Sequence, residues 1–165
     1  MGIRETFLDA YDRYADAIYR HCYFRVFSRA RAEELMQETF LRAWQYLASG
    51  ENVHTMRAFL YRVANNLIID ESRKRKEMSL DAMQEEGSLK EPTEDGAEAL
   101  EQGVLVKEVL EELRALDRDE RTIILMRYVD EFEPREIAEV TGMSVNVVSV
   151  KLHRALKKVR RHMQT

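Results

Sequence analysis

The side chains best suited to contact nucleic acid lie near the C-terminus, between positions 133 and 161. Pro134 suits the first turn of a helix, Gly142 can end that helix, and Ser144 can cap a second one. From residue 144 onward there are six Lys or Arg residues and no acidic residue. This spacing predicts a helix-turn-helix, a motif that places its second helix in the DNA major groove.

The second helix of this motif is expected to have two distinct faces. Helical periodicity places Val148, Leu152, Ala155, Leu156 and Val159 on one buried stripe. Amide, imidazole and guanidinium groups on the opposite face can hydrogen-bond to base edges, and an exposed valine can contact a thymine methyl group. A solvated amphipathic helix is the alternative interpretation. The face opposite the stripe holds Asn146, Val147, Val150, His153, Arg154 and Lys157.

A second basic segment covers residues 57–76, with a net charge of +4. In a helix over 56–76, the side chains of Arg62, Asn66, Asp70 and Arg73 share one face, and Asp70 can pair with Arg73 one turn later. Amide and guanidinium groups are suited to base edges, while the basic run 73–76 is suited to phosphates. A solvated helix end is the other interpretation of such a run.

The helix expected over 32–47 has a face of a different kind. Leu41 lies at the centre of side chains rich in hydrogen-bond acceptors, which include Glu34, Gln37 and Glu38. This arrangement is typical of a protein-binding surface with a basic counterpart. A solvated face that happens to contain one leucine explains the same pattern, and periodicity does not separate the two.

Composition limits the class of protein. The 165 residues include two prolines and six glycines among many helix-forming residues, which predicts an all-α fold. Cys22 is the single cysteine, so no internal disulfide can form, and no apolar run is long enough to span a membrane. We therefore expect a cytoplasmic protein. The four histidines are scattered, and no metal-ligand cluster, phosphate loop or nucleophile–base pair is present, so we expect no metal, no cofactor and no enzymatic activity.

The order of segments predicts two small helical domains joined by a flexible acidic linker. Helices are expected over 3–27, 32–47 and 56–76, and then over 104–115, 117–129 and the helix-turn-helix. Residues 77–101 carry a net charge of −8, and their apolar residues show little helical periodicity. We expect a first domain over 1–77, a linker over 78–102 and a second domain over 103–165, without a shared core.

Two blocks of this sequence resemble a known family. The stretches AEELMQETFLRAW (32–44) and FLYRVANNLIIDESRKR (59–75) resemble region two of the extracytoplasmic-function sigma factors of bacterial RNA polymerase. The stretch LDRDERTIILMRYVDEFEPREIAEVTGMSVNVVSVKLHRAL (116–156) resembles region four of the same family. The order of the blocks and the intervening linker also agree with the family.

The resemblance implies roles for particular residues. It implies a transcription initiation factor that binds core RNA polymerase, recognises promoter DNA and promotes strand opening, and that is restrained by an anti-sigma factor. The helix over 32–47 would bind the clamp helices of the largest polymerase subunit through Glu34, Gln37, Glu38 and Leu41. The minus-ten element would be contacted by Asn52, Arg62, Asn66, Asp70 and Arg73. The minus-thirty-five element would be contacted by Asn146, Ser149, Val150, Lys151, His153, Arg154 and Lys157.

A stand-alone helix-turn-helix regulator is the alternative function. It accounts for the C-terminal half, but leaves the block over 32–76 without a role. A nucleic-acid enzyme is a third possibility, and no group of residues in the sequence supports it.

Overall fold

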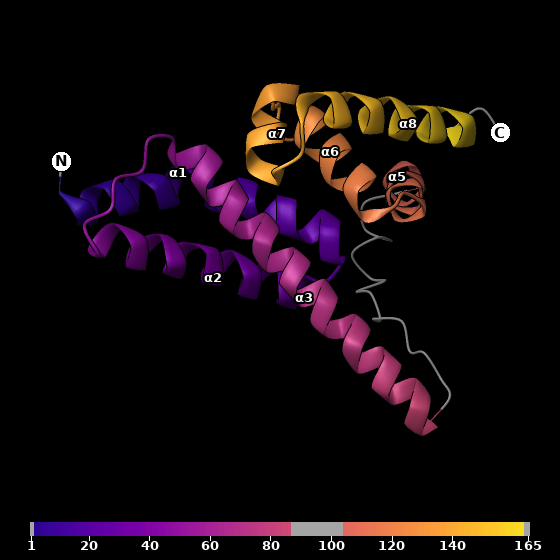
Figure 1. The fold of residues 1–165 in the computed structure, drawn as a ribbon, viewed down its shortest axis with the longest axis horizontal. Helices are drawn as coiled ribbons and strands as arrows, with labels where there is room; N and C mark the ends of the chain where they lie inside the picture. The colour runs from indigo at the N-terminus through magenta and orange to yellow at the C-terminus, as the bar shows by residue number, and fades with distance from the viewer. Residues whose placement is uncertain (1, 87–103, 164–165) are drawn as a thin grey trace.

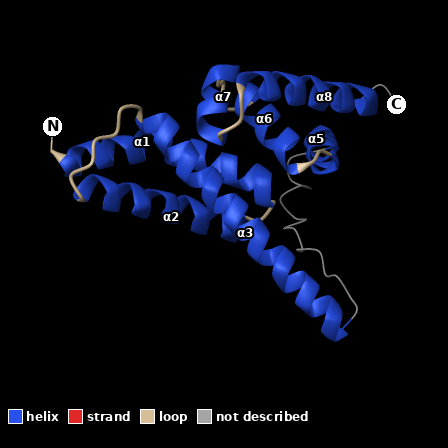
Figure 2. Cartoon of the chain, in the orientation of Figure 1, coloured by secondary structure: helices blue, strands red, loops and turns tan. Residues whose placement is uncertain are grey.

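The computed structural model describes residues 2–86 and 104–163 of the chain, and the described residues form helices joined by short turns (Figure 2). This confirms the predicted all-α class. Most of the predicted linker, residues 87–102, lies outside the described residues. The first three helices are α1 (Ile3–Val26), α2 (Arg29–Ala48) and α3 (Met56–Glu86). The later four are α5 (Val104–Ala115), α6 (Arg118–Tyr128), α7 (Pro134–Thr141) and α8 (Val145–Met163).

Local chemistry determines several of these boundaries. Phe27 adopts a left-handed conformation (φ 54°) at the end of α1, and the hydroxyl oxygen of Ser28 accepts the N–H of Arg31 to begin α2. At the start of α6, the Asp117 carboxylate accepts the N–H of Glu120 at 2.8 Å, while the Glu120 carboxylate accepts the N–H of Asp117 at 3.2 Å. This reciprocal pair is a capping box.

Helix α3 is longer than predicted. It continues through residues 77–86, and residues 78–86 of this stretch fall in the predicted flexible linker. These residues are acidic and lack an apolar period, but they contain no Gly or Pro, and most of them are good helix formers. Gly87 is the first helix-breaking residue after them. The acidic composition was therefore a poor guide to the end of this helix.

The two halves of the chain pack against each other. Helix α3 contacts α7, and α1 contacts α6, so that α7 and α8 lie on the opposite side of α1 and α3 from α2 (Figure 1). One apolar cluster joins Ile18, Leu60 and Tyr61 of the first half to Met126 and Phe132 of the second. The expectation that the two domains would not share a core is therefore wrong for this arrangement.

A physical reason for the shared core is found on α3. Helix α3 contacts α1 and α2 as well as α7, and Tyr61, Ala64 and Ile68 are among its buried residues, so apolar residues of α3 serve both halves. The rings of Tyr61 and Phe132 meet edge to face, with their centroids 4.8 Å apart. No helix within the described residues has the length and apolar character needed to cross a membrane.

Candidate nucleic-acid and protein interfaces

The turn between α7 and α8 has the predicted geometry. Pro134 is the first residue of α7, and Gly142 ends this helix in a left-handed conformation (φ 79°) that favours glycine. The Ser144 hydroxyl accepts the N–H of Val147 at 3.1 Å and so caps α8. These contacts set the angle at which α8 leaves the turn.

Helix α8 has the two faces predicted from its periodicity. Val148 and Ala155 are fully buried, and Leu152, Leu156 and Val159 pack against the cores. Helix α8 lies along the outer edge of the molecule (Figure 1), and most side chains opposite its buried stripe are exposed. Exposed members of the predicted minus-thirty-five set are Asn146, Ser149, Val150, His153, Arg154 and Lys157.

Lys151 belongs to the same predicted set but lies differently. It is partly buried, and its Nζ is 3.0 Å from Oδ2 of Asp119, near the start of α6. Lys158 makes a similar bridge, with its Nζ 2.7 Å from Oε1 of the buried Glu120. Lys151 therefore ties α8 to α6 in this structure, and contact with DNA would require its ammonium group to leave Asp119.

The predicted minus-ten residues lie on α3 and in the loop that precedes it. Asn66, Asp70 and Arg73 are exposed on one side of α3, and Asn52 is exposed in the loop. Arg62 is also exposed, but its Nη2 donates a hydrogen bond to the backbone carbonyl of Glu139 at 3.1 Å. Because Glu139 belongs to α7, the beginning of this α3 face contacts the second half of the chain while Arg62 stays exposed.

The predicted polymerase-binding face of α2 is uncovered. Helix α2 packs on α1 and α3, away from α7 and α8 (Figure 1). Glu34 and Gln37 are exposed, Glu38 is partly exposed with its carboxylate 3.2 Å from Nε of Arg42, and Leu41 is 49% exposed. Leucine exposed to this extent on a well-packed helix is a candidate contact for another protein.

Sequence reasoning missed the size of this apolar surface. Leu8, Tyr11 and Trp44 are exposed as well, and the rings of Phe7 and Trp44 join α1 to α2 with their centroids 5.3 Å apart. Leu8 and Tyr11 belong to the apolar positions that recur along α1 at helical spacing. Such a stripe does not show which of its margins a neighbouring helix covers.

A buried polar group joins the two halves. The Tyr61 hydroxyl donates to Oδ1 of Asp130 at 2.8 Å, and Nδ1 of His21 lies 3.4 Å from Oδ2 of the same carboxylate. Burial is the main cause that lowers the pKa of His21, and burial also raises the pKa of Tyr61. The Arg57 guanidinium donates to the backbone carbonyl of Asp130 and stacks on the Phe132 ring at 3.8 Å.

Sequence reasoning missed the members of this polar group. His21 was interpreted as one of four scattered histidines, and the sequence contains no local signal that pairs it with a residue of the second half. The described residues contain no group of three or more His, Cys, Asp or Glu side chains arranged to hold a metal ion. Cys22 is buried and free, and burial raises its pKa to about 12.

Comparison with known families gives a consistent result in both halves. Residues 10–78 match the family "Sigma-70 region 2", and residues 107–159 match "Sigma-70, region 4". The chain is 30% identical to the ECF RNA polymerase sigma factor SigW of Bacillus subtilis, with 99% of this chain and 91% of that protein aligned. It is also 30% identical to the ECF sigma factor SigL of Mycobacterium tuberculosis, over 93% of this chain and 86% of that protein.

Two solved structures are similar in fold. The sigma factor RpoE of Bartonella quintana, in complex with the anti-sigma factor NepR, superposes with a TM-score of 0.80 over 98% of both chains, at 19% identity. CnrH, in complex with the cytosolic domain of CnrY, superposes with a TM-score of 0.74 over 98% of this chain and 89% of that one, at 20% identity.

Proposed function

This chain belongs to the ECF RNA polymerase sigma factors and is an alternative sigma factor for transcription initiation, and we propose that its work is divided among three helices. Helix α2 binds core polymerase, α3 with the loop before it opens the minus-ten element, and α8 reads the minus-thirty-five element. The observation that carries this proposal is the α7–α8 geometry, since it presents a continuous exposed face on α8.

The residues on each surface suit the proposed partner. The α2 surface combines an exposed leucine with carboxylate groups, which fits a protein partner with basic side chains. The α8 surface combines amide, imidazole and guanidinium groups for base edges with Lys157 for phosphate. The match of residues 10–78 to region two gives the first half a role that a stand-alone regulator would not need.

The packing of the two halves suggests an order of events. The α2 face is open while α7 is held against the start of the α3 face by the Arg62 hydrogen bond, so polymerase can bind first and the second half can then move away from α3. An anti-sigma factor that holds the halves together would keep the chain inactive. An anti-sigma factor is present in the RpoE structure, and we propose one for this chain. The proposed site of action is the cytoplasm, where core polymerase meets the chromosome.

Reconstitution with core polymerase tests this function. The wild-type chain is expected to co-purify with core polymerase and to give permanganate-reactive thymines on promoters selected by the holoenzyme. The Asn66→Ala variant should bind polymerase normally but give weaker thymine reactivity, because Asn66 is exposed on the proposed strand-opening face. Failure of the wild-type chain to bind polymerase would reject the function. Normal opening by the variant would reject the role of Asn66 alone.

A further inference from the structure

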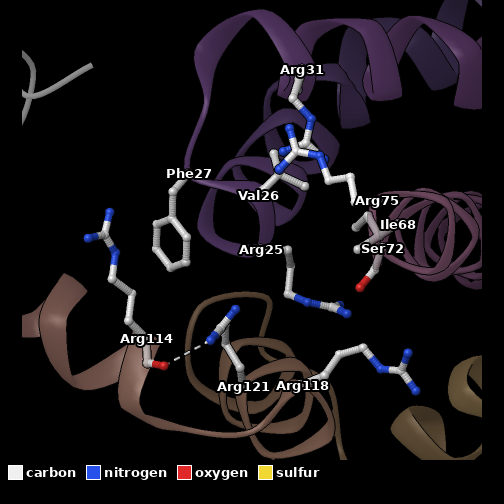
Figure 3. A pocket seen from close by; sticks show the side chains of 10 residues that line it. All are labelled: Arg25, Val26, Phe27, Arg31, Ile68, Ser72, Arg75, Arg114, Arg118 and Arg121. Atoms are coloured by element: carbon white, nitrogen blue, oxygen red, sulfur yellow. Dashed lines mark hydrogen bonds between the residues drawn. The ribbon is translucent and has the colours of Figure 1, made fainter. Parts of the chain in front are cut away.

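A pocket rich in arginine lies between the two halves of the chain. Its volume is about 440 Å³, and the side chains around it are drawn in Figure 3. No acidic side chain is among its lining residues. Three of the arginines come from α1, α2 and α3, and the other three come from α5 and α6, so the complete pocket exists only while the halves are packed together. The six arginines are Arg25, Arg31, Arg75, Arg114, Arg118 and Arg121.

Arg25 is the most buried of the six. Arg25 is 7% exposed. Its Nη1 donates a hydrogen bond to Oδ1 of Asn65, an uncharged amide, at 3.1 Å. Among the residues that the structure describes, no carboxylate forms an ion pair with it. Burial, and then the positive charge of Arg121, lower its pKa to about 9. A buried cation in this position is unfavourable unless an anion comes close to it.

Carboxylates near Arg31, Arg118 and Arg121 balance only part of the positive charge of these three arginines. Arg31 pairs with Glu71 beside the pocket, and Arg118 is 3.9 Å from Oδ1 of Asp119, a carboxylate that Lys151 also contacts. Arg121 donates to backbone carbonyls at and just after the end of α5, at distances from 2.7 to 3.2 Å. Within the described part of the chain no carboxylate forms an ion pair with it, and the Asp117 carboxylate acts on its charge without a direct contact. Around the pocket, positive groups therefore outnumber the acidic groups next to it.

We propose that this pocket binds a small anion that carries two or more phosphate groups, and that the bound anion holds the two halves of the chain together. Guanidinium groups form paired hydrogen bonds with phosphate oxygens, and arginines on both sides of the pocket can each engage a phosphate. The volume is in the range of small-molecule sites and is too small for duplex DNA. Inorganic pyrophosphate and the phosphate chain of a nucleotide share this chemistry.

Such a ligand would act on the arrangement of the chain. Because both halves supply arginines, the anion binds the packed arrangement in preference to a separated one, and the free energy by which it stabilises that arrangement rises with the logarithm of its concentration above the Kd. The packed arrangement is the one in which α7 contacts the start of the α3 face. Binding of the anion is independent of the proposed function, whereas an effect on transcription rests on it.

Calorimetric titration of the full chain with pyrophosphate tests the site, with a double variant, Arg75→Gln with Arg118→Gln, for comparison. Arg75 is partly exposed and Arg118 is exposed, so the double variant should fold, which circular dichroism can verify. We expect pyrophosphate to bind the wild-type chain and to bind the double variant at least about tenfold more weakly, because charged hydrogen bonds are lost. Arg135→Gln, at an exposed arginine of α7 outside the pocket, is the matched control and should bind like the wild type.

Further titrations identify the source of the phosphate groups. Tighter binding of a nucleoside triphosphate than of pyrophosphate would point to a nucleotide, and equal binding would point to the phosphate chain alone. Energy transfer between dyes on the two halves should rise on addition of pyrophosphate in the wild type and not in the double variant. The proposal is overturned if pyrophosphate does not bind at millimolar concentration, if the double variant and the wild type bind equally, or if a single-stranded oligonucleotide displaces pyrophosphate from the pocket.

Discussion

Replacing Tyr61 by phenylalanine should loosen the packing between the two halves. The Tyr61 hydroxyl donates to the buried Asp130 carboxylate at 2.8 Å, within the normal range for such bonds, and the residue is 2% exposed. The ring would remain, so its edge-to-face contacts with Phe132 and His21 should be kept. A buried hydrogen bond to a charged group contributes roughly 1.5–3 kcal/mol. A loss of about 2 kcal/mol lowers the ratio of packed to separated chains by roughly 30-fold.

Energy transfer between two dyes can measure this ratio. Suitable attachment sites are exposed positions changed by Glu33→Cys on α2 and Arg160→Cys on α8. The native Cys22 should not react, because it is fully buried and burial raises its pKa to about 12. The Tyr61→Phe variant should show lower transfer than the parent chain. Tyr128→Phe removes a hydroxyl from a residue that is 58% exposed, and it should leave the transfer unchanged.

Urea unfolding of the same variants separates two explanations. If Tyr61→Phe lowers the free energy of unfolding but leaves the energy transfer at the parent value, the hydrogen bond supports the first half and does not hold the two halves together. If neither quantity changes, the reasoning from the Tyr61–Asp130 contact is refuted. If closure restrains activity, the variant should also bind core polymerase more tightly than the parent chain.

Three further predictions concern the other surfaces and the buried histidine. Leu41→Asp should weaken core-polymerase binding by about 2 kcal/mol without unfolding the chain. The control Ile3→Asp changes an apolar residue of similar exposure off the α2 face, and it should leave this binding unchanged. Equal affinities of the two variants in a binding titration would contradict the assignment of Leu41. Arg154→Ala should cost roughly 1–3 kcal/mol of binding free energy and relax the base preference at one promoter position. Lys157→Ala should weaken binding to all upstream-element variants alike and reduce the dependence of affinity on salt concentration. A defect of Arg154→Ala that is uniform across the variants would exclude base readout. Burial lowers the pKa of His21, so the folded chain takes up fewer protons than the unfolded chain as the pH falls. The contribution of His21 to stability should therefore be constant above its ordinary pKa of about 6.5 and decrease as the pH drops below that value. Urea midpoints that do not change between about pH 7.5 and about pH 5.5 would argue against this.

The helix-turn-helix could be predicted from the sequence because its determinants are local. The Pro134 position, the left-handed Gly142 and the Ser144 cap each act within one or two turns of the chain. The buried stripe of α8 follows from its own periodicity. The same local rules explain the capping box at Asp117. Signals of this kind do not depend on which other helix lies nearby.

The end of α3 was predicted less well for a related reason. Residues 78–86 were predicted to belong to a linker because they are acidic and lack an apolar period. Periodicity reports burial, whereas helix formation also depends on propensity and on the absence of Gly and Pro. A helix that projects beyond its packing partners therefore lacks the pattern by which buried helices are recognised (Figure 1).

The sequence by itself determined the helical class, the order of the two regions, the turn before α8 and the faces of α2 and α8, because these depend on neighbours in the chain. The tertiary structure alone decided which faces meet. Tyr61 and Asp130 are 69 positions apart, and Arg25 shares its pocket with Arg121 from the other half. A histidine or arginine within an amphipathic helix has the same local pattern whether it is solvated or buried against a distant segment. Only the packing of α1 and α3 on α6 and α7 brings these polar groups together and removes them from water.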